Sequence, residues 1–242
     1  MTASTEAVHT KIREKYAQAA TGARCCGGGA CCTSAYSPDE LRRIPAESAL
    51  GLGSGNPVRH ADLRPGETVV DLGSGAGVDV FLAAERVGPE GQSIGIDLTP
   101  AMVDKARAIA TEGRISNVSF LLAPIERIPL PDAFAEAVVS NCVINLSPAK
   151  LDVFREALRI LRPGGRLVIS DVVQEWPLGP IEDECGCVAT AMARGEYFET
   201  IRLAGFVKAQ VMEDRPWRSG PGGPEASAVT VVARKPNRER TA

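Results

Sequence analysis

The feature that most constrains this chain is a regular alternation of short apolar runs and helical segments between residues 67 and 171. Nearly continuous apolar strands joined by helices predict a parallel sheet that is covered on both faces. A helix at 196–205 and two further strands, expected to pair as an antiparallel hairpin, follow. The predicted class is therefore α/β, with a mostly parallel seven-stranded sheet and strands at 67–72, 92–97, 117–123, 136–141, 166–171, 207–213 and 226–234.

Two helices are predicted ahead of this alternation. Residues 5–19 carry Val8, Ile12, Tyr16 and Ala19 at helical spacing, a stripe that we expect to dock on the main domain. A second helix is expected over 38–50, with Ser37 as N-cap, proline at the first helical position and glutamate three residues after the cap. We expect an N-terminal helical and cysteine-rich extension, a main domain and a disordered tail, at 1–60, 61–235 and 236–242.

Composition excludes several classes of partner. The net charge of −3 gives no broad basic field, so we expect no nucleic-acid partner. Apolar runs fall short of a membrane span, and the first residues lack the apolar segment of a secretory signal. We therefore expect a cytoplasmic protein with reduced thiols. Only His9 and His60 could serve as a histidine base, and both are expected at the surface.

A glycine-rich loop, DLGSGAG, follows the first predicted strand and opens a helix. Glycines allow a tight turn and a close approach to a ligand, and the helix N-terminus presents unpaired N–H groups. Val78 stands where a dinucleotide fingerprint needs its third glycine, and no Gly-Lys-Ser/Thr of a P-loop follows. Asp97 ends the second strand, where a carboxylate can accept both hydroxyls of a ribose. The two features together predict a nucleoside-containing cofactor.

Four segments then carry a resemblance to a known family: VVDLGSGAG, GIDLTPAMVDKA, LPDAFAEAVVSNCVINL and RILRPGGRLVISD. They are similar to the class I S-adenosylmethionine-dependent methyltransferases, which have a Rossmann-like fold. SNCVINLSP, CGCVATA and the double-cysteine N-terminal run resemble the arsenite methyltransferases more closely. The resemblance covers about residues 41–211. It implies S-adenosylmethionine as cofactor, held by Asp71, Gly73, Ser74, Gly75, Gly77, Asp97, Leu98, Thr99, Met102, Ile125, Glu126 and Asn141.

The resemblance also gives the cysteines a role, because arsenic(III) is a soft centre that prefers thiolate sulfur. It implies Cys142 and Cys187 as the arsenic ligands and catalytic thiols, with Cys185 as a possible third ligand. The alternative for each is a small buried apolar side chain. Many family members carry a cysteine in a GCGNP motif where this chain has Ser54, and a serine hydroxyl is a poor arsenic ligand. The third sulfur is therefore left open.

The run CCGGGACC, with Cys25, Cys26, Cys31 and Cys32, has three interpretations. Zinc binding is disfavoured because zinc knuckles use Cys-x₂₋₄-Cys spacing, and adjacent cysteines chelate one ion poorly. The run could instead capture the metalloid or shuttle thiols, or it could be a dispensable tail. The sequence leaves these interpretations open.

The resulting functional prediction is methyl transfer from S-adenosylmethionine to thiol-bound arsenic(III). The arsenic lone pair needs no deprotonation, which agrees with the shortage of histidine. The substrate is expected to be arsenite or an arsenic–thiol conjugate, with glutathione or thioredoxin as thiol reductant, and the protein to be a monomer. One alternative is a class I methyltransferase for another small acceptor, and a second is a non-catalytic metalloid-binding protein.

Overall fold

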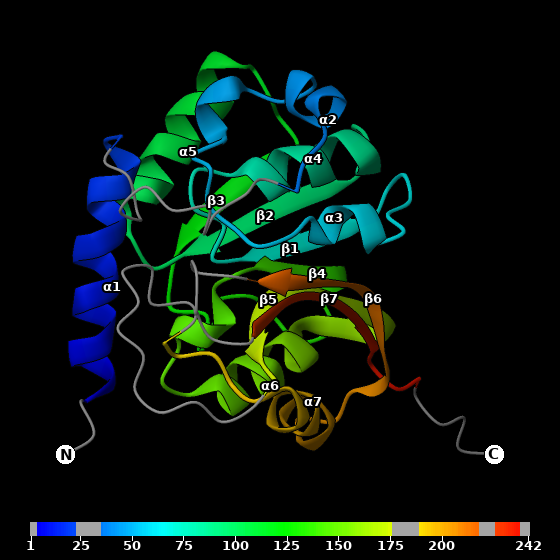
Figure 1. Ribbon diagram of the computed structural model, residues 1–242. Helices are drawn as coiled ribbons and strands as arrows, with labels where there is room; N and C mark the ends of the chain where they lie inside the picture. The colour runs from blue at the N-terminus through cyan, green and yellow to red at the C-terminus, as the bar shows by residue number, and fades with distance from the viewer. Residues whose placement is uncertain (1–3, 23–34, 176–188, 218–225, 238–242) are drawn as a thin grey trace.

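The computed structural model describes residues 4–22, 35–175, 189–217 and 226–237, and its centre is one seven-stranded sheet (Figure 1). The strand order is β3-β2-β1-β4-β5-β7-β6. This arrangement confirms the predicted α/β class. The strands are β1 (Thr68–Leu72), β2 (Gln92–Asp97), β3 (Val118–Leu122), β4 (Ala135–Asn141), β5 (Leu161–Gln174), β6 (Val207–Trp217) and β7 (Ala226–Arg234).

The first five strands pair in parallel, and β7 alone among the seven described strands runs against the others. In the sheet centre, Val70 of β1 pairs with Ile94 of β2 and Val138 of β4. The chain changes direction across the sheet between β1 and β4, which is the point where open α/β sheets bind ligands. β7 runs antiparallel to both β5 and β6, so the predicted C-terminal hairpin is confirmed.

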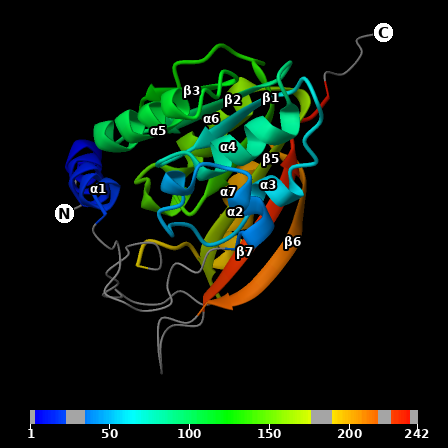
Figure 2. The ribbon, with the colours of Figure 1, turned by 90° about the horizontal axis from the view of Figure 1, so that it is seen from above.

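Helices cover both faces of the sheet, as the apolar strands require (Figures 1 and 2). Phe81 and Val103 belong to the core on one face, and Phe154 and Tyr197 to the core on the other. α1 packs beside α5, at the edge of the helical layer whose core contains Phe81 and Val103. The helices are α1 (Thr5–Ala20), α2 (Pro38–Arg42), α3 (Pro57–His60), α4 (Val78–Val87), α5 (Pro100–Glu112), α6 (Lys150–Ile160) and α7 (Arg194–Leu203).

Several predicted boundaries were wrong, and among them β6 continues past its predicted end at residue 213 to Trp217. The helix expected over 38–50 ends at Arg42, and only a 3₁₀ turn, Ala46–Ser48, follows. Pro45 explains the break because the residue before a proline avoids helical backbone angles. The pair Ser147-Pro148 predicts the start of a helix, but α6 begins at Lys150. Strand β5 continues on both sides of the predicted 166–171. The capping box of Ser37 and Glu40 is present as predicted.

The expected surface position of His9 was also wrong. His9 on α1 is 8% exposed, and its Nε2 lies 3.3 Å from Glu126 Oε1. His60 is half-buried, with its Nε2 2.7 Å from Glu213 Oε1. Each histidine thus joins two elements that lie far apart in the sequence.

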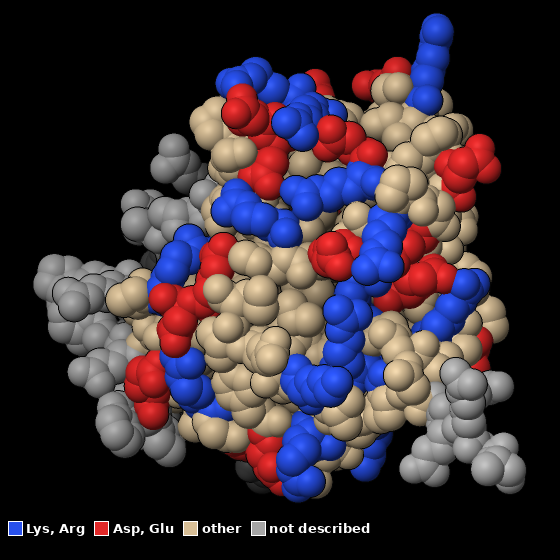
Figure 3. Space-filling model, turned by 90° about the vertical axis from the view of Figure 1, so that its right-hand side faces the viewer, with Lys and Arg blue, Asp and Glu red and all other residues tan. Residues whose placement is uncertain are grey.

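The surface shows charges of both signs. Lys and Arg side chains are interspersed with Asp and Glu on the face drawn in Figure 3. Within the ranges that the structure describes, no helix combines the length and the apolar character that crossing a bilayer requires.

Candidate active site

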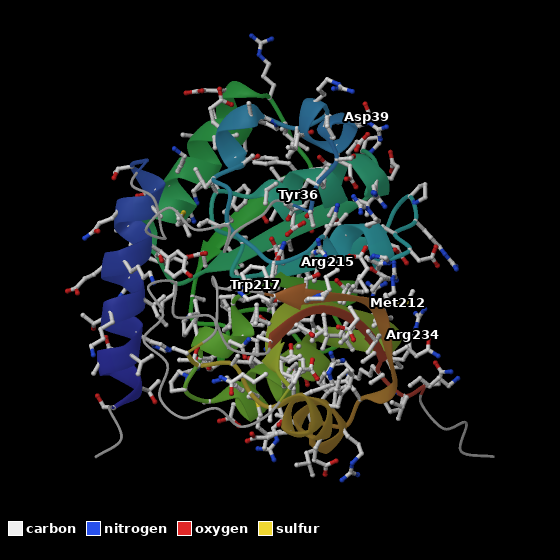
Figure 4. All side chains as sticks on the ribbon, viewed as in Figure 1. Tyr36, Asp39, Met212, Arg215, Trp217 and Arg234 are labelled. Atoms are coloured by element: carbon white, nitrogen blue, oxygen red, sulfur yellow. The ribbon has the colours of Figure 1, made fainter. Side chains whose placement is uncertain are left out.

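One cavity of about 240 Å³ lies at the carboxyl ends of the central strands. The loops after β1, β2 and β4 form its floor, and α1 and the segment 48–53 close its sides. Tyr36 reaches it from the segment before α2, and Trp217 from the end of β6 (Figure 4). It occupies the edge at which parallel α/β sheets bind their ligands.

The glycine loop has the tight turn that the sequence predicts. Gly73, Gly75 and Gly77 have φ angles of 72°, 53° and 97°, a region that residues with a Cβ rarely adopt. A Cβ at Gly73 would lie 2.4 Å from Val143 Cγ2, so any other residue there would force the two loops apart. Gly77 then caps α4. The loop can therefore bring its backbone against a ligand.

Asp97 is held at the end of β2 by two backbone N–H groups. Gly75 N donates to Asp97 Oδ2 and Thr99 N donates to Asp97 Oδ1, each at 2.8 Å. The pKa of Asp97 is raised overall, because the effect of burial outweighs that of these backbone hydrogen bonds, which lower it. Each carboxylate oxygen has a second lone pair. Because Asp97 also lines the cavity, those lone pairs suit the vicinal hydroxyls of a ribose.

The cavity brings together ten of the twelve residues predicted for the cofactor. Gly77 and Met102 are the exceptions: Gly77 packs against Phe81 and Phe120, and Met102 is 1% exposed within the core. They support the loop from behind. The ten that line the cavity are Asp71, Gly73, Ser74, Gly75, Asp97, Leu98, Thr99, Ile125, Glu126 and Asn141.

The charges around the cavity suit a cation. Four carboxylic acids line it, whereas no described lining residue is Lys or Arg; the acids are Asp71, Asp79, Asp97 and Glu126. Burial raises the pKa of Asp79 to about 6. Burial also raises the pKa of Asp71, as do its neighbours Asp79 and Asp97. A sulfonium and an α-ammonium group fit this cavity, whereas the pyrophosphate of a dinucleotide does not.

Asn141 is the hub of a hydrogen-bond network beside the cavity. Its Oδ1 accepts from Ser54 N at 3.0 Å and Gly55 N at 3.2 Å. Its Nδ2 donates to Gly55 O, to Tyr36 Oη and to Asp79 Oδ2. These contacts use the whole capacity of the amide. Asn141, predicted to contact the cofactor, lines the cavity and also holds the residues around it in place.

Sequence reasoning missed Tyr36 and Asp79. Tyr36 Oη donates to Asp79 Oδ2 at 2.7 Å, and burial raises the pKa of Tyr36 well above its usual range. Asp79 stands in the first turn of α4, where an acid is ordinarily explained by the helix dipole. The sequence pattern alone therefore does not indicate that Asp79 lines the cavity.

Cys142 stands where the resemblance places a substrate thiol. It follows β4, lines the cavity and is half-buried. Its φ of 59° turns the chain out of the sheet, and its N–H donates to Ser170 O at 2.7 Å. Cys187, Cys185 and the four cysteines at 25, 26, 31 and 32 lie outside the described residues. Within the described ranges, no three potential ligands come together as a metal site.

Ser54 stands where the GCGNP motif of the resembled family has a cysteine. Its side chain is 2% exposed, and its Oγ has no hydrogen-bond partner in the described part of the chain. Asn141 holds its N–H, and Arg215 Nη2 donates to its carbonyl at 2.8 Å. The loop is therefore held from both sides, by β4 and by β6.

Comparison with known proteins supports the family. Residues 63–210 match the family described as methyltransferase domain. An arsenite methyltransferase of Halobacterium salinarum is 39% identical over 97% of this chain and 68% of its own length. The chain belongs to the arsenite methyltransferase family. A second arsenite methyltransferase, from Aquipseudomonas alcaligenes, is 33% identical over 86% of this chain, which spans 65% of that relative.

Solved structures confirm the class I methyltransferase fold for this arsenite methyltransferase family member. An arsenic(III) S-adenosylmethionine methyltransferase from Chlamydomonas reinhardtii superposes with a TM-score of 0.67 at 28% identity, covering 86% of this chain and 72% of that one. The [4+2]-cyclase SpnF gives a TM-score of 0.69 at 20% identity, over 95% of this chain and 96% of its own. The latter likeness shows the fold alone.

Proposed function

We propose that this chain transfers methyl groups from S-adenosylmethionine to trivalent arsenic held by thiolates. One observation carries the proposal: Cys142 lines the same cavity as the glycine loop and Asp97. A soft, arsenic-binding sulfur thus stands beside a site built for a cationic nucleoside. The names of the relatives support the same acceptor.

The residues around the cavity fit S-adenosylmethionine. Asp97 is oriented to accept the ribose hydroxyls, Ile125 and Glu126 offer a wall for the adenine, and Asp71 and Asp79 face its positive charges. Ser74 Oγ is buried without a partner among the described residues and offers a further polar contact. When bound, the cofactor supplies an electrophilic methyl group on a sulfonium sulfur.

Cys142 and Cys187 are proposed as the arsenic ligands, with Cys185 or an exogenous thiol completing the set. Ser54 is buried and is not among the residues that line the cavity, so its hydroxyl leaves that third position to another sulfur. Thiolates bind arsenic better than thiols do, and holding the acceptor in place lowers the barrier through orientation.

The reaction needs no general base. The arsenic lone pair forms the As–C bond as the S–C bond breaks, and the positive charge passes from sulfur to arsenic. Arsenic is thereby oxidised to the pentavalent state. Its return to the trivalent state takes two electrons from a pair of thiols, for which we propose glutathione or thioredoxin. We place this chemistry in the cytoplasm, where such thiols are reduced, in a monomeric protein.

The decisive experiment is product analysis after incubation with arsenite, S-adenosylmethionine and glutathione. The wild type should produce methylated arsenic. Cys142→Ser should lose at least about 99% of this activity, because a hard hydroxyl cannot replace the thiolate. Calorimetry should find cofactor binding unchanged, since Asp97 and the glycine loop are intact. Full activity of Cys142→Ser would refute the assignment of this thiol, and an inactive wild type would refute the function.

A further inference from the structure

The last residue of β6 is buried although most of the strand is exposed. β6 is an edge strand, and Val211 and Met212 are 42% and 47% exposed. Trp217 is only 8% exposed (Figure 4). It pairs with Ala226 of β7, which places it over the sheet end that carries the cavity. The strand thus delivers one large aromatic side chain to the site.

Near its C-terminal end, β6 pairs with β7 regularly enough to tell which side chains share a face of the strand. Residues from 213 to 217 pair with β7 without a register shift. Side chains two positions apart on a strand share a face, so Arg215 and Trp217 point to the same side. Arg215 Nη2 donates to Ser54 O, and Trp217 lines the cavity. One face of β6 therefore holds the Ser54 loop and contributes the cavity wall.

Trp217 packs in a small cluster that Cys142 joins. Val172, Ala226 and Ala228 form the rest of this cluster, and Cys142 packs against it. The indole Nε1 is buried, with no hydrogen-bond partner within the described ranges. Since Nε1 is buried while the ring lines the cavity, the part of the ring that faces the cavity is carbon. Trp217 therefore offers an apolar wall to the cavity, within the cluster that Cys142 packs against.

An apolar wall distinguishes the possible acceptors. A hydroxyl group on arsenic loses hydration against carbon and gains no hydrogen bond there, whereas a methyl group gains dispersion contacts. From this geometry, and resting on the proposed function, we infer that Trp217 is a specificity residue for the acceptor. It packs against the methyl group of a methylarsenic(III) species held at Cys142 and favours the addition of a second methyl group.

The test compares kcat/KM for methylarsenite and for arsenite, each supplied as trivalent arsenic with S-adenosylmethionine and glutathione. Trp217→Ala should lower the methylarsenite-to-arsenite ratio about tenfold, the low end of what an apolar pocket gives for one methyl-sized group. Trp217→Phe keeps a carbon wall and should hold the ratio within about twofold. Met212→Ala, on the exposed part of the same strand, is the matched control and should leave the ratio unchanged.

A parallel fall in both rates for Trp217→Ala, with the ratio unchanged, would mean a merely structural role and would overturn the inference. So would an equal loss of the ratio in Trp217→Phe. Wild-type protein that methylates neither species would refute the proposed function itself. Binding gives an independent readout, because the chain has two tryptophans and Trp176→Phe leaves only Trp217. Methylarsenite should change its fluorescence, and a Cys142→Ser background should abolish that change; an unchanged signal on saturation would refute the contact.

Discussion

Replacing Asn141 by alanine should lower the free energy of unfolding by more than the removal of a buried asparagine outside the cavity network does. Two oxygen and three nitrogen contacts join Asn141 to four other residues. The Nδ2 group has only two hydrogens, so about four of these contacts act at once. At about 1 kcal/mol for each bond, with the added cost of two partly buried N–H groups left unpaired, we expect a loss of about 3–5 kcal/mol in the free energy of unfolding.

Asn145 offers a matched control, because it lies on the 3₁₀ turn Ile144–Leu146, which follows β4. Asn145 is fully buried, whereas Asn141 is half-buried. The Nδ2 of Asn145 donates to Val172 O at 2.6 Å, and its Oδ1 has no partner within the described residues. It does not line the cavity. Asn145→Ala should therefore cost about 1–2 kcal/mol, the effect of one buried hydrogen bond and a small cavity.

Urea unfolding and calorimetry with S-adenosylmethionine measure the two effects. Asn141→Ala should weaken cofactor binding at least about tenfold, because Asp79 and the Gly53–Gly55 loop lose their common anchor. Asn145→Ala should bind the cofactor normally. If the two variants lost equal stability, or if Asn141→Ala bound the cofactor as the wild type does, the reasoning about the network would be wrong.

Two further predictions concern stability. Ser54→Ala removes a buried hydroxyl that has no partner among the described residues, so urea unfolding should show a gain of up to about 1–2 kcal/mol; a loss of that size would reveal an unseen partner. Burial raises the pKa of Asp171 from 3.8 to about 7, while the hydrogen bond from Tyr197 lowers it. The folded state thus favours the protonated acid, and its contribution to stability is complete below about pH 4 and lost as pH rises through about 7. Asp171→Asn cannot ionise, so its free energy of unfolding relative to the wild type should rise between pH 5 and pH 8, by about 2–3 kcal/mol. Urea unfolding at the two pH values measures this rise, and a constant difference would refute the assignment.

The sequence predicted those parts of the site that depend on local pattern. Strands β2 and β7 have the predicted bounds, because a short apolar run and the residues that end it act over a few positions of the sequence. Asp97 followed from the same logic, since a residue at the end of a parallel strand lies at the ligand edge. The cysteine after β4 and the likeness to arsenite methyltransferases were equally visible in the sequence.

Only the tertiary structure decided how distant segments complete the cavity. His9 docks on Glu126, Tyr36 bonds to Asp79 and Asn141, and Trp217 packs near Cys142. No periodicity or spacing encodes these pairings, because each joins elements whose contact depends on the packing of the whole sheet and its helices. The sequence by itself therefore located the glycine loop and the cysteine that we propose as the acceptor thiol, whereas the folded chain decided which side chains hold them in place and which surface lies beside Cys142.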